Sequence, residues 1–274
     1  SNCKVIALTN QKGGVGKTTT AVNLGVSLVQ QGKKVLLIDA DAQANLTMAL
    51  GYNRPDDIPI TLSTVMQNII DDKTLDVSQD IIHHREGIDL LPSNIELSGF
   101  EVRLINAMSR ERVLKTYVNE VKKNYDYVLI DCMPSLGMIT INALAAADSV
   151  IIPTQPHYLS AKGLELLLRS VSMVKRQINP KLRIDGILMT MVMPRTNISK
   201  EITATVKSAY GKKIKVFDTE IPHSIRAVEA TAEGKSIFAY DKSGKVAAAY
   251  EQLGKEVAEI GEKQRNQNRA DRIR

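Results

Sequence analysis

Short apolar segments alternate with longer stretches of helical periodicity along the whole 274-residue chain. A short continuous apolar run, such as V-L-L-I-D at 35–39, is typical of a strand buried on both faces of a parallel sheet. We expect strands at about 5–8, 35–39, 87–93, 125–131, 149–153, 184–192 and 214–217. We expect helices at about 18–31, 62–70, 95–123 with a break near Ser109, 139–147, 161–178, 197–210, around Arg226 and Glu229, and from about 243 to beyond 260. At the break, Ser109 is expected to cap the helix that resumes at Arg110.

This alternation predicts the fold class. Strand–helix–strand units build a parallel sheet through right-handed crossovers. We therefore predict an α/β protein with a single doubly wound, mostly parallel sheet, helices on both faces, and ligands at the carboxyl ends of the strands. No internal repeat or linker divides the chain, so residues 1–260 are expected to form one domain. The polar, basic stretch 261–274 is either a solvated extension, which we favour, or an arm that touches DNA.

A glycine-rich loop follows the first predicted strand, with the sequence T-N-Q-K-G-G-V-G-K-T-T-T at 9–20. Gly13, Gly14 and Gly16 permit backbone angles that other residues resist, so the main chain can approach a phosphate closely. The loop leads into a helix, whose N-terminal N–H groups and dipole favour an anion. A strand, a glycine loop and a helix in this order predict a P-loop that binds ATP.

Two side chains after the glycines have distinct expected roles. Lys17 is placed to reach the β- and γ-phosphates of ATP, and the hydroxyl of Thr18 to bind Mg²⁺ directly. The general pattern G-x-x-x-x-G-K-T would have glycine at position 11, where this chain has Gln11 followed by Lys12. The residues expected to contact the nucleotide here are Lys12, Gly13, Gly14, Val15, Gly16, Lys17, Thr18 and Thr19.

Three aspartates follow predicted strands and are candidates for metal and water chemistry. Asp39 and Asp41 stand two residues apart at the end of one strand, and Asp131 ends the run Y-V-L-I-D. We expect Asp41 to position or activate the attacking water, and so to be catalytic together with Lys17. Asp39, Asp41 and Asp131 are all expected to hold Mg²⁺ through water.

Charge is distributed unevenly along a chain whose net charge is +6. Residues 1–159 contain 14 Lys and Arg against 17 Asp and Glu, whereas residues 160–274 contain 22 against 13. A basic half is suited to a polyanion such as DNA, although a basic surface without a partner would give the same count. Two cysteines without metal-ligand spacing, and no apolar run long enough to span a bilayer, indicate a reducing cytoplasm and no membrane.

The motifs resemble those of the ParA/MinD family of deviant Walker A ATPases, closest to the small, Soj-like partition ATPases. The resemblance rests on the loop with Lys12, and on three further stretches in the family's order: D-A-D-A-Q-A-N-L-T at 39–47, V-L-I-D-C-M-P-S-L-G at 128–137, and T-E-I-P-H-S-I-R-A-V-E-A at 219–230. It covers nearly the whole chain. Ala42 and Met133 stand where the family usually has proline, but the neighbouring acids are intact.

The resemblance implies an ATPase with weak intrinsic turnover that partitions DNA. ATP would join two chains in a sandwich homodimer, in which Lys12 of each chain contacts the other's phosphates and takes part in catalysis. The dimer would bind double-stranded DNA non-specifically, until a ParB-like centromere-binding partner stimulates hydrolysis. The turn after Asp131 would sense the γ-phosphate, and Pro222 and Ser224 would pack on adenine. The implied location is the cytoplasm, in association with the nucleoid.

Basic residues of the second half are the candidates for the DNA face. Arg226 has the support of the family match, although an ion pair with Glu229 along the same helix is an alternative for it. The other candidates are Arg195, Lys200, Lys235, Lys242 and Lys245.

The main alternative function is that of a MinD-like positioning ATPase acting on a membrane or another cargo. Membrane attachment needs an amphipathic helix with a bulky apolar face, and Ile273 stands alone among polar residues at the end of the chain. A biosynthetic ATP-dependent enzyme, such as a cobyrinate synthetase relative, would share the fold. A regulatory protein with vestigial hydrolysis is disfavoured by the presence of Asp41 and Asp131.

Overall fold

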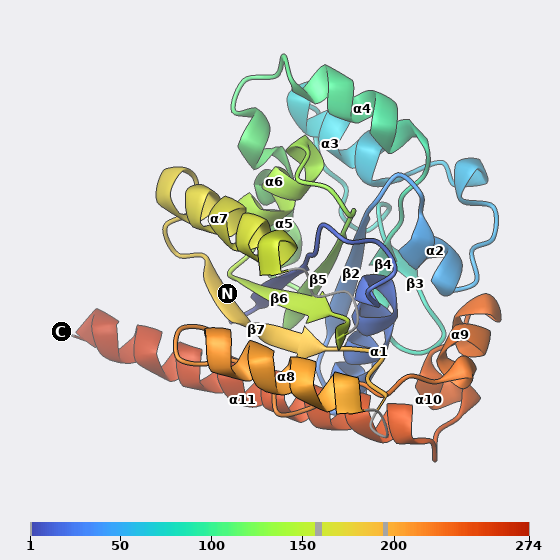
Figure 1. The fold of residues 1–274 in the computed structure, drawn as a ribbon. Coiled ribbons are helices and arrows are strands. Elements are labelled where there is room, and N and C mark those ends of the chain that lie inside the picture. Colours follow the sequence, from blue (N-terminus) through green and yellow to red (C-terminus); the bar gives the residue numbers. More distant parts are fainter. Residues whose placement is uncertain (1, 157–160, 194–196, 274) are drawn as a thin grey trace.

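Within the residues that this computed structural model describes, 2–156, 161–193 and 197–273, seven strands form one sheet in the order β3-β4-β2-β5-β1-β6-β7 (Figure 1). Neighbouring strands pair in parallel, except that β3 is antiparallel to β4. The strands are β1 (Lys4–Leu8), β2 (Val35–Ala40), β3 (Ile82–His83), β4 (Asp89–Leu91), β5 (Tyr127–Cys132), β6 (Ser149–Thr154) and β7 (Arg183–Met189). The predicted mostly parallel α/β sheet is confirmed.

Helices connect the strands and cover the sheet. They are α1 (Lys17–Gln30), α2 (Asn45–Ala49), α3 (Leu62–Ile70), α4 (Glu96–Leu104), α5 (Val113–Val121), α6 (Met138–Ala146), α7 (Ala161–Gln177), α8 (Asn197–Tyr210), α9 (Ile225–Ala232), α10 (Ile237–Tyr240) and α11 (Lys245–Ile273), with short 3-10 turns η1 (Pro55–Asp57) and η2 (Arg110–Arg112). In the described part of the chain, none of these helices combines the length and apolarity that crossing a membrane requires.

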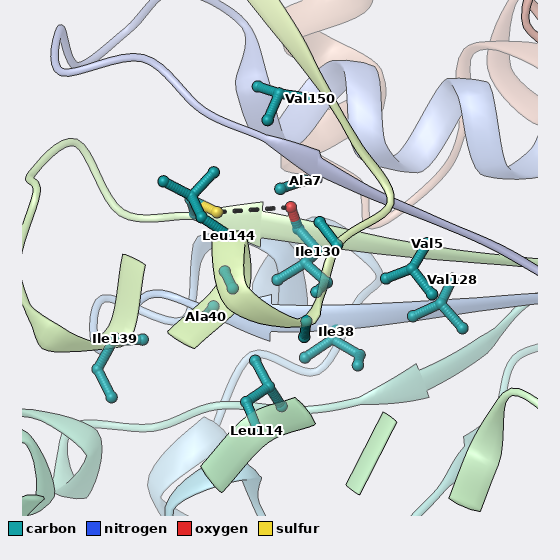
Figure 2. Close-up of a cluster of buried hydrophobic side chains, with 14 of the residues drawn as sticks. Val5, Ala7, Ile38, Ala40, Leu114, Val128, Ile130, Ile139, Leu144 and Val150 are labelled. Atoms are coloured by element: carbon teal, nitrogen blue, oxygen red, sulfur yellow. Dashed lines mark hydrogen bonds between the residues drawn. The ribbon is translucent and has the colours of Figure 1, made fainter. Parts of the chain in front are cut away.

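Two hydrophobic clusters occupy the two faces of the sheet, because side chains alternate along each strand. On β1, Val5 and Ala7 belong to the cluster under α3, α5, α6 and α7, whereas Ile6 and Leu8 belong to the cluster under α1 and α11. Figure 2 shows the first cluster, where side chains of the central strands meet those of α5 and α6. Burial on both faces explains the continuous apolar runs of the sequence.

Helix α11 packs along α1 (Figure 1). The hydroxyls of Tyr250 and Thr20 lie 3.2 Å apart, and a Cβ added at Gly254 would overlap the hydroxyl of Ser27, so the two helices approach closely there. The helix continues past residue 260 and contacts the body again, where Gln264 donates to the carboxylate of the buried Asp185 at 3.0 Å. The stretch 261–273 is therefore helical, and its separation from the domain stays a prediction.

Two local predictions were wrong. The segment 214–217 is not a strand: Val216 forms an isolated parallel bridge to Ile187. The ladder stops because the next N–H groups, of Asp218 and Thr219, donate to the carboxylate of Glu256 on α11 at 3.2 and 3.1 Å. The helix break near Ser109 is confirmed, but Ser109 makes no capping hydrogen bond, because its backbone is left-handed with φ 51°.

Candidate nucleotide-binding site

The glycine loop joins β1 to α1 and lies at the carboxyl edge of the sheet (Figure 1). Gly14 and Gly16 have φ angles of 73° and 80°, which side chains resist, so glycine is required at both positions. A Cβ added at Gly13 or Gly14 would meet no atom within 4 Å, so open space lies over the loop. Helix α1 has no acidic residue in its first turn, and its N-terminal N–H groups are suited to an anion.

Lys17 is the first residue of α1, and its side chain is buried at the loop. Its ammonium donates to the carbonyl of Lys12 at 3.1 Å. Burial lowers the pKa of Lys17, because the charged form is poorly solvated there, and the nearby Asp131 opposes that shift. The loop therefore holds a desolvated cation that a phosphate would neutralise.

The structure brings Thr18 and Asp131 together, two residues for which the sequence predicts a role at Mg²⁺. The hydroxyl of Thr18 donates to Oδ2 of Asp131 at 2.6 Å. Asp131 also stands opposite Asp39 in the register between β5 and β2. Burial, and then the charge of Asp39, raise the pKa of Asp131 to about 7. Each of the two buried carboxylates disfavours ionisation of the other, because like charges repel at short range.

Asp39 and Asp41 are held differently from each other. Asp39 is fully buried, and its Oδ2 accepts from both the N–H and the hydroxyl of Thr47 on α2, at 2.9 and 2.7 Å. Burial raises the pKa of Asp39 to about 7 despite these hydrogen bonds. Asp41 lies just past β2, where it accepts from the N–H of Gln43 at 2.9 Å. Asp41 is thus fixed by its own turn, whereas Asp39 ties β2 to α2.

The residues of this edge fit a nucleotide with a divalent cation. Oδ1 of Asp131 is buried and has no hydrogen-bond partner among the described residues. An orphaned carboxylate oxygen beside a hydroxyl is a donor set suited to Mg²⁺. Thr18 and Asp131 would hold the cation, and Lys17 with the loop N–H groups would hold the phosphates. The individual roles of Lys12 to Thr19, Asp39, Asp41 and Asp131 stay predictions.

Two supports of the loop were missed by sequence reasoning. Thr190, directly after β7, is buried and donates its hydroxyl to the carbonyl of Val15 at 2.8 Å. Asn10 donates to the carbonyl of Pro153 at 2.7 Å, and its Oδ1 accepts from the N–H of Lys12 at 3.0 Å. No local motif marks Thr190, and Asn10 stands within the quoted loop stretch but was assigned no role; strands that run in parallel end at one edge, and a search of the strand ends would have found both.

Replacing Thr190 with valine is expected to weaken binding of ADP and ATP alike by roughly fivefold. Valine has nearly the same shape but no donor, so the buried carbonyl of Val15 would lose its partner, a loss of about 1 kcal/mol. Calorimetric titration with both nucleotides measures the effect. Thr190→Ser, which keeps the hydroxyl, is the matched control and should bind normally; equal affinity in the valine variant would show that the bond does not support the loop.

The predicted adenine segment lies beyond β7. Pro222 forms an isolated bridge to Val192, and the N–H of His223 donates to the carbonyl of Val192 at 3.0 Å. The hydroxyl of Ser224 caps α9 by accepting from the N–H of Arg226 at 3.2 Å. Ser224 therefore has a structural role, and its packing on adenine, like that of Pro222, stays a prediction.

The predicted DNA-binding residues are spread over α8 to α11. Arg226 is exposed and pairs with Asp241 at 3.7 Å, whereas Glu229 accepts from the hydroxyl of Tyr240. Lys235 pairs with Glu233 at 2.7 Å. Lys200, Lys242 and Lys245 are exposed, and Arg195 lies outside the described residues. The Arg226–Asp241 contact brings α9 next to the turn that carries Lys242.

A glycine loop whose threonine meets a strand-end aspartate, on a parallel sheet, defines a P-loop ATPase. A family model described as an AAA domain matches residues 3–184. Sporulation initiation inhibitor protein Soj of Bacillus subtilis is 46% identical over 94% of this chain and 99% of its own. Chromosome partitioning protein ParA of Myxococcus xanthus is 39% identical over 93% of this chain and 87% of its own. The chain belongs to the ParA/MinD family of P-loop ATPases, enzymes that hydrolyse ATP with Mg²⁺.

Solved structures share the whole fold. Cobyrinic acid a,c-diamide synthase from Mycobacterium smegmatis, with a bound ATP analogue and magnesium, is 35% identical with a TM-score of 0.82, over 92% of this chain and 93% of that one. The septum site-determining protein MinD from Pyrococcus horikoshii, complexed with Mg-ADP, is 27% identical with a TM-score of 0.72, over 94% and 97%.

Proposed function

We propose that this protein is a DNA-partitioning ATPase. It dimerises on ATP, binds DNA non-specifically, and is released when a ParB-like centromere-binding partner stimulates hydrolysis at the nucleoid. The observation that carries the proposal is Lys12 within a phosphate loop whose other parts are complete, in a chain 46% identical to Soj and 39% identical to a chromosome partitioning ParA.

The residues of the site would divide the work of hydrolysis. Lys17 and the loop N–H groups hold the phosphates, while Thr18 and Asp131 hold Mg²⁺, which neutralises charge on the phosphates when bound. Asp41 orients the attacking water and accepts its proton, a role that typically contributes 10²- to 10⁴-fold. The fixed turn at Gln43 keeps that carboxylate in place.

A second copy of the chain would complete the site. Lys12 precedes the glycines, whereas Lys17 follows them, and the side chain of Lys12 would contact phosphates of the partner copy. A hollow of about 770 Å³ lies beside the loop, between Gln11, Leu136 and α7. On its α7 side, Leu166 and Met173 are 44% and 45% exposed. Covering apolar side chains is favourable, which supports a dimer surface at this position.

The exposed basic residues near α9 supply a surface for DNA. Arg226 makes one long, solvent-exposed ion pair, and such pairs stabilise the fold by less than about 1 kcal/mol. Arg226 could therefore leave Asp241 and pair with a DNA phosphate at little cost in folding free energy. Lys242 and Lys245 follow Asp241 closely in the chain, and both are exposed.

Retention on DNA tests the function. In low salt, wild-type protein should sediment with non-specific DNA in the presence of ATP or a slowly hydrolysed analogue, but not with ADP. Lys12→Ala should abolish both retention and dimer-dependent turnover, because the site stays incomplete. Combined Arg226→Glu and Lys242→Glu should lower retention at least tenfold and flatten its salt dependence, because phosphate contacts are lost.

Two matched controls accompany the experiment. Lys34→Ala, an exposed lysine at the opposite end of α1, controls for Lys12; Lys73→Glu, an exposed lysine in the acidic half, controls for the charge reversals. DNA binding that is equal with ATP, with ADP and without nucleotide would refute the proposal that ATP controls DNA binding. Undiminished DNA retention of the combined Arg226→Glu and Lys242→Glu variant would refute the assignment of these residues to the DNA-binding surface.

The similarity to MinD and to cobyrinic acid a,c-diamide synthase makes two other outcomes concrete. Sedimentation with lipid vesicles, in place of DNA, would favour the MinD-like alternative. A rate of ATP hydrolysis that does not change with DNA or vesicles, but rises with a small carboxylic acid, would favour a biosynthetic ATPase.

A further inference from the structure

The turn 133–137 joins β5 to α6 and adjoins the nucleotide site on two sides. It follows Asp131, whose carboxylate accepts from Thr18 of the loop at 2.6 Å. Its residue Leu136 lines the same hollow as Gln11, which precedes the glycines. A displacement of this turn would therefore be transmitted to the site.

Helix α6 begins directly after this turn without a cap of its own. Its N-cap position is Gly137, which has no side chain, and its first turn contains no acidic residue. The N–H of Ile139 donates instead to Oε1 of Glu101, on α4, at 3.1 Å. A carboxylate at this position satisfies an otherwise unpaired N–H and interacts favourably with the helix dipole. The cap thus comes from a different helix.

Gly137 lies directly against the carboxylate of Glu101. Its φ of −69° and ψ of −179° describe an ordinary extended backbone, which any residue can adopt. Backbone conformation therefore does not explain glycine here. A Cβ at this position would overlap Oε1 of Glu101 and lie 3.2 Å from its Cδ. The missing side chain makes room for the carboxylate.

We propose that Glu101 is a positioning residue for ATP hydrolysis: from α4 it anchors the first turn of α6, and so fixes the preceding turn 133–137, which is expected to face the γ-phosphate. The inference rests on the proposed hydrolysis of ATP at this site and on the γ-phosphate-sensing role that the family resemblance implies for the turn. An unanchored turn spends less time in the reactive arrangement, so the chemical step slows. Because ADP has no γ-phosphate, its binding does not depend on the anchor.

Three substitutions separate the parts of this anchor. Glu101→Ala removes the acceptor, Glu101→Asp retracts it by one methylene, and Glu101→Gln keeps an oxygen at the same reach without the charge. We expect kcat for ATP hydrolysis to fall about fivefold to tenfold in the alanine and aspartate variants, and to stay within about twofold in the glutamine variant. Affinity for ADP should be unchanged in all three. Hydrogen–deuterium exchange of the segment 132–141 should be faster wherever kcat falls.

Glu96→Ala is the matched control, because Glu96 is exposed in the first turn of the same helix. Normal kcat and normal exchange in Glu101→Ala would overturn the proposal. So would a glutamine variant as impaired as the alanine variant, or a loss of ADP affinity parallel to that of kcat, since either indicates a general loss of structure. Failure of the proposed partition role would be seen in a different measurement. ATP hydrolysis by the wild-type protein would then not rise with DNA or with the partner protein, whereas the Glu101 variants are compared by their intrinsic rate of hydrolysis, without DNA or partner.

Discussion

Asp41→Ala is expected to lower ATP hydrolysis by about 10²- to 10³-fold while ATP still binds, because a carboxylate that accepts the proton of the attacking water contributes on that scale. The side chain is buried just past β2 and is held by the N–H of Gln43 at 2.9 Å, so it is fixed before nucleotide arrives. Without hydrolysis the ATP-bound state persists, and the variant should stay on DNA in the presence of ATP. Single-turnover phosphate release and DNA sedimentation measure the two effects.

Asp41→Asn is the informative companion to this variant. Asparagine can still accept from the N–H of Gln43, so the turn is preserved, but it cannot take a proton. Both variants should therefore be equally slow. An asparagine variant that turns over normally would show that Asp41 acts by shaping the turn, and normal turnover in the alanine variant would remove Asp41 from the reaction altogether.

Lys17→Met is expected to weaken binding of MgATP by roughly 100-fold, because charge-assisted hydrogen bonds to the phosphates are lost. Methionine is chosen to keep the length of the buried aliphatic stem. Thermal stability of the nucleotide-free protein should hold, since the buried ammonium of Lys17 has a pKa lowered by desolvation and stabilises the empty fold little. Fluorescent-nucleotide titration and a melting curve together test both statements.

Lys34→Met provides the comparison, since Lys34 is exposed beyond the far end of α1. It should bind MgATP normally. Unchanged affinity in Lys17→Met would contradict the assignment of the loop. A fall in melting temperature of the Lys17 variant without nucleotide would instead show that the ammonium helps to hold the empty loop together.

Features that depend on neighbouring residues were predictable from the sequence. The apolar period of three and four placed α3 at the residues where it lies, and the run before Asp131 marked β5. One contact across 113 positions was also expected, that of Thr18 with Asp131, because both residues were assigned to the same Mg²⁺.

Other features that depend on contacts between distant residues were not predictable. Thr190 supports Val15 from 175 positions away, and no pattern connects them. Helix α2, which carries Thr47 to Asp39, has five residues and is too short to show a period. The segment 214–217 has the apolar composition of a strand, but Glu256, on a helix far along the chain, captures the next N–H groups.

The hydrogen bond from the ammonium of Lys17 to the carbonyl of Lys12 joins the two lysines of the loop before any nucleotide is bound. An ammonium has three N–H donors, so Lys17 can keep this carbonyl and still donate to a phosphate. The side chain that would hold the phosphates would then also hold the peptide from which Lys12 extends. In the proposed dimer, nucleotide loading of one protomer would therefore help to fix the backbone of the lysine that reaches its partner.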